Sequence, residues 1–175
     1  PIHLVAPGDD ELITRLEQKY YVLPGTRRPY TAVPLVMVVP ESLVDAPISL
    51  ESLSHDRAVR VAIADPTLST LGAKSRELLM ASGVWSALQG RLYMASDGRN
   101  VLDHLLNGEA DVGIIYGPEA VRESQRVRIV TFSSQVAVPL TVHSLAMERF
   151  CPNRSLCEEF LAFSQSAEAQ AALRL

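Results

Sequence analysis

Apolar and polar positions alternate in blocks through the middle of the chain, and these blocks predict strands followed by helices. Apolar runs typical of buried strands occupy residues 60–64, 91–95, 111–116 and 128–132. Between them, helices are predicted over residues 72–82 and 99–106. Strands that alternate with helices of this length indicate βαβ units and a mainly parallel sheet with helices on both faces. The middle of the chain is therefore expected to be an α/β domain.

The two ends of the chain follow a different pattern. Strands are predicted at residues 1–5, 33–39 and 136–142, and helices at 10–19, at 155–164 and from 167 onward. Two extended segments with prolines, 32–40 and 133–142, bracket the regular block. We therefore predict a discontinuous, partial first lobe, formed by residues 1–38 and 137–175, with residues 39–136 inserted as a second lobe.

Composition fits a globular protein and disfavours several classes. The 175 residues are 47% hydrophobic and 21% charged, which excludes a disordered chain. The net charge of -4 disfavours a sequence-independent nucleic-acid binder. No apolar run approaches the roughly 18 residues of a membrane span, so none is predicted. Cys151 and Cys157 could form a disulfide or remain two free thiols, and the sequence does not choose between them.

Ligands of doubly wound sheets bind at the carboxyl ends of the strands, and three such ends are identified in the middle block. They are the loop 65–71 before Gly72, the segment 95–98, and Tyr116. The first two lead into helix N-termini, whose unpaired N–H groups can bind a small oxyanion. α/β proteins in general have such helix ends, and most of these are capped by their own side chains, which is the alternative interpretation of this spacing.

Sequence patterns of the common enzymes are missing. There is no Gly-x-Ser-x-Gly elbow, no Walker A motif and no Gly-x-Gly-x-x-Gly fingerprint. No pair of histidines has metal-ligand spacing. We therefore expect no catalytic residues, no metal ligands and no cofactor.

Three segments at these strand ends resemble the periplasmic molybdate-binding proteins. They are Ala-Asp-Pro-Thr-Leu-Ser-Thr-Leu-Gly at 64–72, Ser-Asp-Gly-Arg-Asn-Val-Leu at 96–102, and Gly-Glu-Ala-Asp-Val-Gly-Ile-Ile-Tyr-Gly-Pro-Glu-Ala at 108–120. The resemblance implies an α/β fold like that of type II periplasmic binding proteins, with two lobes of mixed, mainly parallel sheets. In that family a segment with two serine-bearing loops precedes the part that matches Pro1. Nothing in this chain matches that segment, so the first lobe is expected to be incomplete at its N-terminus.

The resemblance also implies a function and a site. It implies a periplasmic or otherwise extracytoplasmic solute-binding protein for a molybdate- or tungstate-like oxyanion, with the permease of an ABC transporter as partner. The ligand-binding residues that it implies are Leu71 and Gly98, through their backbone N–H groups, and Tyr116, through its hydroxyl. The alternative is a ligand-sensing or structural module of the same fold, outside transport, with an altered or lost anion site.

Overall fold

The computed structural model describes residues 2–43, 48–133 and 135–173, which divide into two compact units. Unit 1 consists of Pro1–Val33 and Thr141–Leu175, and unit 2 of Pro34–Leu140. The division falls inside strand β2, Arg28–Pro40, and at the first residue of strand β7, Leu140–Met147. These borders lie a few residues from the predicted lobe borders at 38/39 and 136/137, because β2 is one unbroken strand that both units share.

Unit 2 is built on a mixed sheet with the strand order β2-β5-β3-β4, in which β6 also pairs with β2. The further strands are β3 (Val61–Ala64), β4 (Leu92–Ala95), β5 (Val112–Tyr116) and β6 (Val127–Val130). β3 runs parallel to both β4 and β5, whereas β2 is antiparallel to β5 and β6. The carboxyl ends of β3, β4 and β5 therefore meet at one edge of the sheet.

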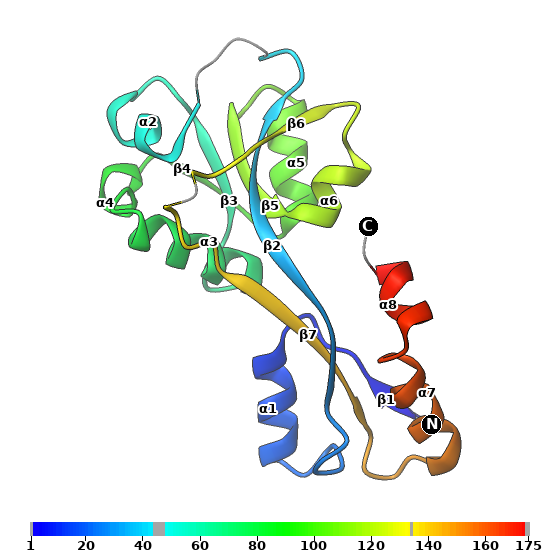
Figure 1. The fold of residues 1–175 in the computed structure, drawn as a ribbon. Helices are drawn as coiled ribbons and strands as arrows, with labels where there is room; N and C mark the ends of the chain where they lie inside the picture. Colours follow the sequence, from blue (N-terminus) through cyan, green and yellow to red (C-terminus); the bar gives the residue numbers. More distant parts are fainter. Residues whose placement is uncertain (1, 44–47, 134, 174–175) are drawn as a thin grey trace. The chain divides into compact units, whose positions relative to one another are not determined.

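Helices cover both faces of this sheet (Figure 1). They are α2 (Leu50–His55), α3 (Thr70–Ala81), α4 (Trp85–Leu88), α5 (Gly98–Leu106) and α6 (Gly117–Arg122). The chain passes from β3 to β4 through α3 and returns to β5 through α5. Right-handed crossovers in opposite directions place these two helices on opposite faces. Gly113 in β5 allows α5 to approach closely, since a Cβ there would lie 2.8 Å from Val101 Cγ1.

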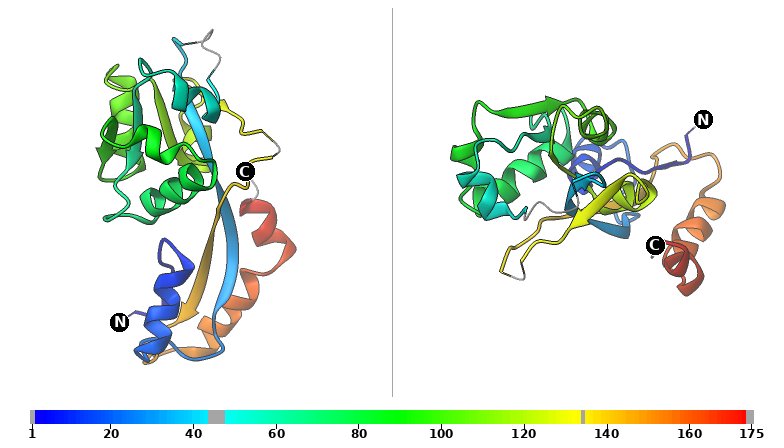
Figure 2. Two further views of the ribbon diagram at one scale, coloured as in Figure 1. Left: turned by 90° about the vertical axis from the view of Figure 1, so that its left-hand side faces the viewer. Right: turned by 90° about the horizontal axis from the view of Figure 1, so that it is seen from above.

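Unit 1 contains strand β1 (Leu4–Val5), which is antiparallel to β7, and helices α1 (Asp10–Gln18), α7 (Arg154–Phe163) and α8 (Ala167–Leu173). Figures 1 and 2 show α1 and α7 on opposite sides of β7. Successive side chains of β7 point toward α1 and toward α7 in turn, because side chains alternate between the two faces of a strand. Ala146 packs with Ile13 of α1, and Met147 packs with Leu161 of α7.

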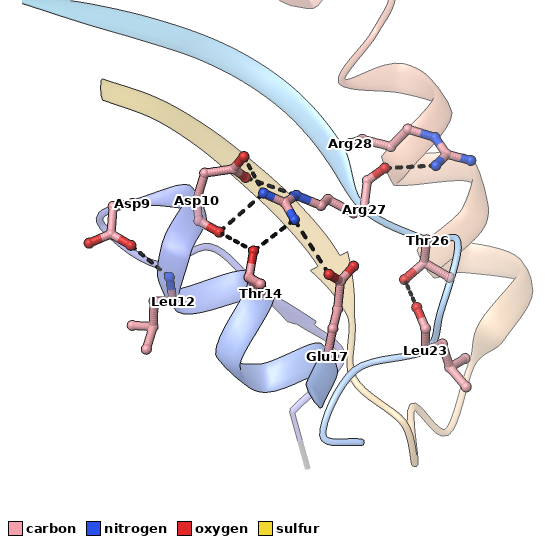
Figure 3. Close-up of polar contacts among 9 residues, drawn as sticks. All are labelled: Asp9, Asp10, Leu12, Thr14, Glu17, Leu23, Thr26, Arg27 and Arg28. Carbon is pink, nitrogen blue, oxygen red and sulfur yellow. Dashed lines mark hydrogen bonds and ion pairs between the residues drawn. The ribbon is translucent and has the colours of Figure 1, made fainter. Parts of the chain in front are cut away.

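An arginine fixes α1 against the start of β2 (Figure 3). The Arg27 guanidinium donates to Asp10 Oδ1 at 2.9 Å, to Thr14 Oγ1 at 3.1 Å and to Glu17 Oε2 at 3.4 Å. Asp9 caps the helix by accepting the Leu12 N–H at 2.7 Å. Unit 1 is therefore held together by two small apolar clusters and by the hydrogen bonds of Arg27 with α1.

Several predicted elements at the chain ends are wrong in detail. The buried strand predicted at 1–5 is reduced to β1, Leu4–Val5, and Ile2 before it is 63% exposed, while Pro1 lies outside the described residues. The strand predicted at 136–142 begins four residues later, after Pro139, and continues to Met147. Proline lacks the N–H that a strand ladder needs, so strand pairing starts beyond it. Helices α4 and α6 were not predicted, because each is too short to show a helical period.

Cys151 and Cys157 are free thiols in the structure and both are buried, with their Sγ atoms 2.6 Å apart. Burial raises the pKa of the Cys157 thiol to about 11, and the hydrogen bond with Cys151 adds to this effect. The Cys157 thiol is therefore protonated at neutral pH, and the pair forms part of the apolar cluster beneath α7.

Candidate functional site

The first candidate segment, between β3 and α3, is an ordered turn built on Asp65. Its carboxylate accepts the Thr67 hydroxyl at 2.6 Å and the Thr67 N–H at 2.7 Å, and these bonds hold the pKa of Asp65 below its ordinary value. The Asp65 N–H donates to the carbonyl of Ala95 at 2.7 Å. This bond joins the end of β3 to the end of β4.

Leu71 is the second residue of α3. Ser69 is the N-cap of that helix and accepts the Gly72 N–H at 3.0 Å. The Leu71 N–H has no hydrogen-bond acceptor among the described residues. It is one of the orphan donors that every helix start leaves.

Gly72 brings the start of α3 very close to the end of β3. A Cβ at this position would lie 2.5 Å from the Ala64 carbonyl oxygen and would also overlap the backbone carbonyl of Asp65. Only a glycine fits this approach, so Gly72 fixes the position of the neighbouring Leu71 N–H.

Gly98 is the first residue of α5, and Asp97 is its N-cap. The Asp97 carboxylate accepts the Asn100 N–H at 2.9 Å, which holds the pKa of Asp97 below its ordinary value. No acceptor for the Gly98 N–H is found in the part of the chain that the structure describes. A second helix start therefore offers an orphan donor at the same sheet edge.

Tyr116 is the last residue of β5 and the N-cap of α6. Its side chain is half-buried and packs against the core of unit 2. Because β3 lies between β4 and β5, the three predicted residues Leu71, Gly98 and Tyr116 follow the carboxyl ends of three adjacent strands. The fold thus brings them to one edge of one unit.

The charges near this edge are mostly compensated or negative. Arg99 lies 3.2 Å from Glu123 and 3.5 Å from Asp103, so its charge is shared with two carboxylates. Asp97 and Glu119 place two further carboxyl groups beside the start of α5. An anion held here would depend on backbone donors and helix dipoles rather than on a free cation.

Glu119 was missed as a residue of this edge, although the sequence carried a signal for it. It stands three residues after the N-cap Tyr116, which is the spacing of a capping box. Its carboxylate accepts the Tyr116 backbone N–H. Only the structure reveals that the same carboxyl also lies against Gly98.

Neither a metal-binding cluster nor a membrane-spanning helix is found in residues 2–43, 48–133 and 135–173. No group of three His, Cys, Asp or Glu side chains there could hold a metal ion. No helix of that part is long and apolar enough to cross a bilayer.

The chain belongs to a family of bacterial extracellular solute-binding proteins, whose model matches residues 1–174. Among its relatives is the molybdate-binding protein ModA of Escherichia coli (strain K12), which is 28% identical over 134 residues. That match covers 74% of this chain and 52% of the relative. The chain spans about half the length of the curated relatives it matches. The resemblance to molybdate-binding proteins is thus confirmed.

Solved structures confirm the fold. The periplasmic molybdate-binding protein of Azotobacter vinelandii superposes with a TM-score of 0.74 at 19% identity, over 97% of this chain and 74% of that one. The substrate-binding protein of an ABC transporter from Agrobacterium tumefaciens gives 0.75 at 17% identity, over 94% and 59%. The predicted α/β periplasmic-binding-protein fold is therefore the fold of this chain.

Proposed function

We propose that this protein is an extracytoplasmic solute-binding protein for a small tetrahedral oxyanion of the molybdate or tungstate type, and that it feeds an ABC transporter. The observation that carries the proposal is the convergence of Leu71, Gly98 and Tyr116 on one sheet edge. Two of these residues present orphan N–H donors and the third a hydroxyl. The relatives named for molybdate binding support the same ligand class.

The chemistry of the edge suits a fully deprotonated oxyanion. Such an ion needs only hydrogen-bond donors, and helix N-termini supply donors together with about half a positive charge each. The protein would act by binding and releasing its ligand, with no bond made or broken. Its partner would be the permease of the transporter.

A thermal-shift measurement with molybdate, tungstate, sulfate and phosphate tests this proposal. A ligand that binds only the folded state stabilises it by RT ln(1 + [L]/Kd), which is about 2.7 kcal/mol at a hundredfold excess over Kd. We expect the melting temperature to rise with molybdate and tungstate, and to change little with sulfate, phosphate or chloride at equal ionic strength. An unchanged melting temperature with all four oxyanions would contradict the proposal.

The Tyr116→Phe variant tests the hydroxyl donor. Losing a hydrogen bond to a charged ligand costs about 1.5–3 kcal/mol, so molybdate should bind roughly ten- to a hundredfold more weakly. Titration calorimetry of both proteins gives the comparison, with Tyr93→Phe as the control, because Tyr93 is an exposed tyrosine of another strand of the same sheet, β4. Equal affinity of Tyr116→Phe and the unmodified protein would remove Tyr116 from the site.

A further inference from the structure

A half-buried carboxyl group lies against Gly98, one of the residues proposed to bind the anion. Glu119 is the third residue of α6, and a Cβ added to Gly98 would lie 2.9 Å from Glu119 Cδ and would overlap Glu119 Oε2. The carboxyl therefore fills the space where other residues at position 98 would carry a side chain. Glu119 and the start of α5 are in direct contact.

The two carboxyl oxygens of Glu119 have different surroundings. The carboxylate accepts the backbone N–H of Tyr116, and this bond favours the ionised form. Oε2 is buried and has no hydrogen-bond partner among the described residues. An ionised carboxylate with a dry, unpaired oxygen is unfavourable, and a proton on that oxygen would remove the charge.

The charged groups around Glu119 come from two elements. Asp97, at the start of α5, disfavours the ionised form of Glu119, and Arg122 on α6 favours it. Arg99 and Glu123 line the same surface hollow as Glu119 and are paired with each other at 3.2 Å. Burial is the largest effect and raises the pKa of Glu119 above its ordinary value.

We propose that Glu119 is a proton-sensitive residue of the anion site, so that binding of a fully deprotonated oxyanion is coupled to the uptake of one proton by the Glu119 carboxyl. This inference rests on the proposed function. In the ionised form Glu119 places a negative charge beside the Gly98 N–H, where it repels the ligand. In the protonated form it leaves the N-terminus of α5 to the oxyanion.

The sign of the pH dependence follows from this coupling. A bound anion raises the pKa of Glu119 further, because it disfavours the ionised carboxylate. At pH values below the Glu119 pKa of the ligand-free protein, the affinity for the oxyanion is constant and at its highest. As the pH rises through that pKa, Kd increases by at most tenfold per pH unit, and it levels off above the pKa of the bound form. A ligand-induced pKa change of one unit corresponds to about a tenfold change in Kd.

Titration calorimetry with micromolar molybdate from pH 5 to pH 8.5 tests the inference. We expect Kd of the unmodified protein to rise about tenfold over this range. The Glu119→Gln variant keeps the shape of the side chain and an acceptor for the Tyr116 N–H, so its affinity should be independent of pH and at least as high as the low-pH affinity of the unmodified protein. The control is Glu109→Gln, which removes the same charge beyond the far end of α5 and should keep the unmodified profile.

The outcomes separate the inference from the proposed function. Molybdate binding whose pH profile is flat in the unmodified protein, or is the same in Glu119→Gln, would overturn the inference alone. Absence of binding to both proteins at every pH would overturn the proposed function and the inference with it. A carbon-13 NMR titration of the Glu119 carboxyl, with and without molybdate, provides a reading that does not require the variant to fold. An unchanged Glu119 pKa on ligand addition would also overturn the inference.

Discussion

The Gly72→Ala variant is expected to lose about 3 kcal/mol of unfolding free energy, which is the upper part of the usual range for an overpacked core. The added methyl group would meet backbone rather than a flexible side chain, with the Ala64 carbonyl oxygen at 2.5 Å. Neither β3 nor the start of α3 can move without disturbing the buried core of unit 2. Chemical denaturation followed by circular dichroism measures the change.

Gly8→Ala is the matched control for this variant. A Cβ at Gly8 has no atom within 4 Å, and its backbone φ is not in the left-handed region. Its unfolding free energy should stay within about 0.5 kcal/mol of that of the unmodified protein. If Gly72→Ala were as stable as Gly8→Ala, the close approach of α3 to β3 would be wrong.

The second large effect is expected on ligand binding, from a pair of substitutions at Gly98. Gly98→Ala and Gly98→Pro both add a Cβ that must displace Glu119, but only proline also removes the N–H. Proline suits the first residue of a helix. Asp97 before it has extended backbone, with φ -160 and ψ -179, so its conformation is not the helical one that a following proline disfavours. The fold should therefore tolerate both variants alike.

The comparison of these two variants isolates the contribution of the Gly98 N–H. We expect Gly98→Pro to bind molybdate roughly ten- to a hundredfold more weakly than Gly98→Ala, since a hydrogen bond to a charged group contributes about 1.5–3 kcal/mol. Titration calorimetry on both variants measures the ratio, and their melting temperatures check that both fold. Equal affinities would show that the Gly98 N–H does not bind the ligand.

The regular middle of the chain was predictable because its signals are local. Four apolar residues of β3 followed by the Asp65-Pro66 turn define a buried strand and its end, and Asp97 defines the start of α5 by its capping side chain. The chain ends were less predictable. Strand β7 crosses the border between the two units. It is exposed at Leu140 and buried at Met147, so its side chains do not alternate regularly between buried and exposed along the whole strand.

The α/β class, the positions of the central strands and helix caps, and the family resemblance that selected Leu71, Gly98 and Tyr116 could all be inferred from the order of residues. These features depend on neighbours within about one helical turn or one strand, which the order of residues displays directly. Three features are known only from the folded chain: β3 lies between β4 and β5, Gly72 approaches the backbone of Asp65, and Glu119 lies against Gly98. Such contacts join residues of different helices and strands, and they are set by strand pairing and close packing rather than by local pattern.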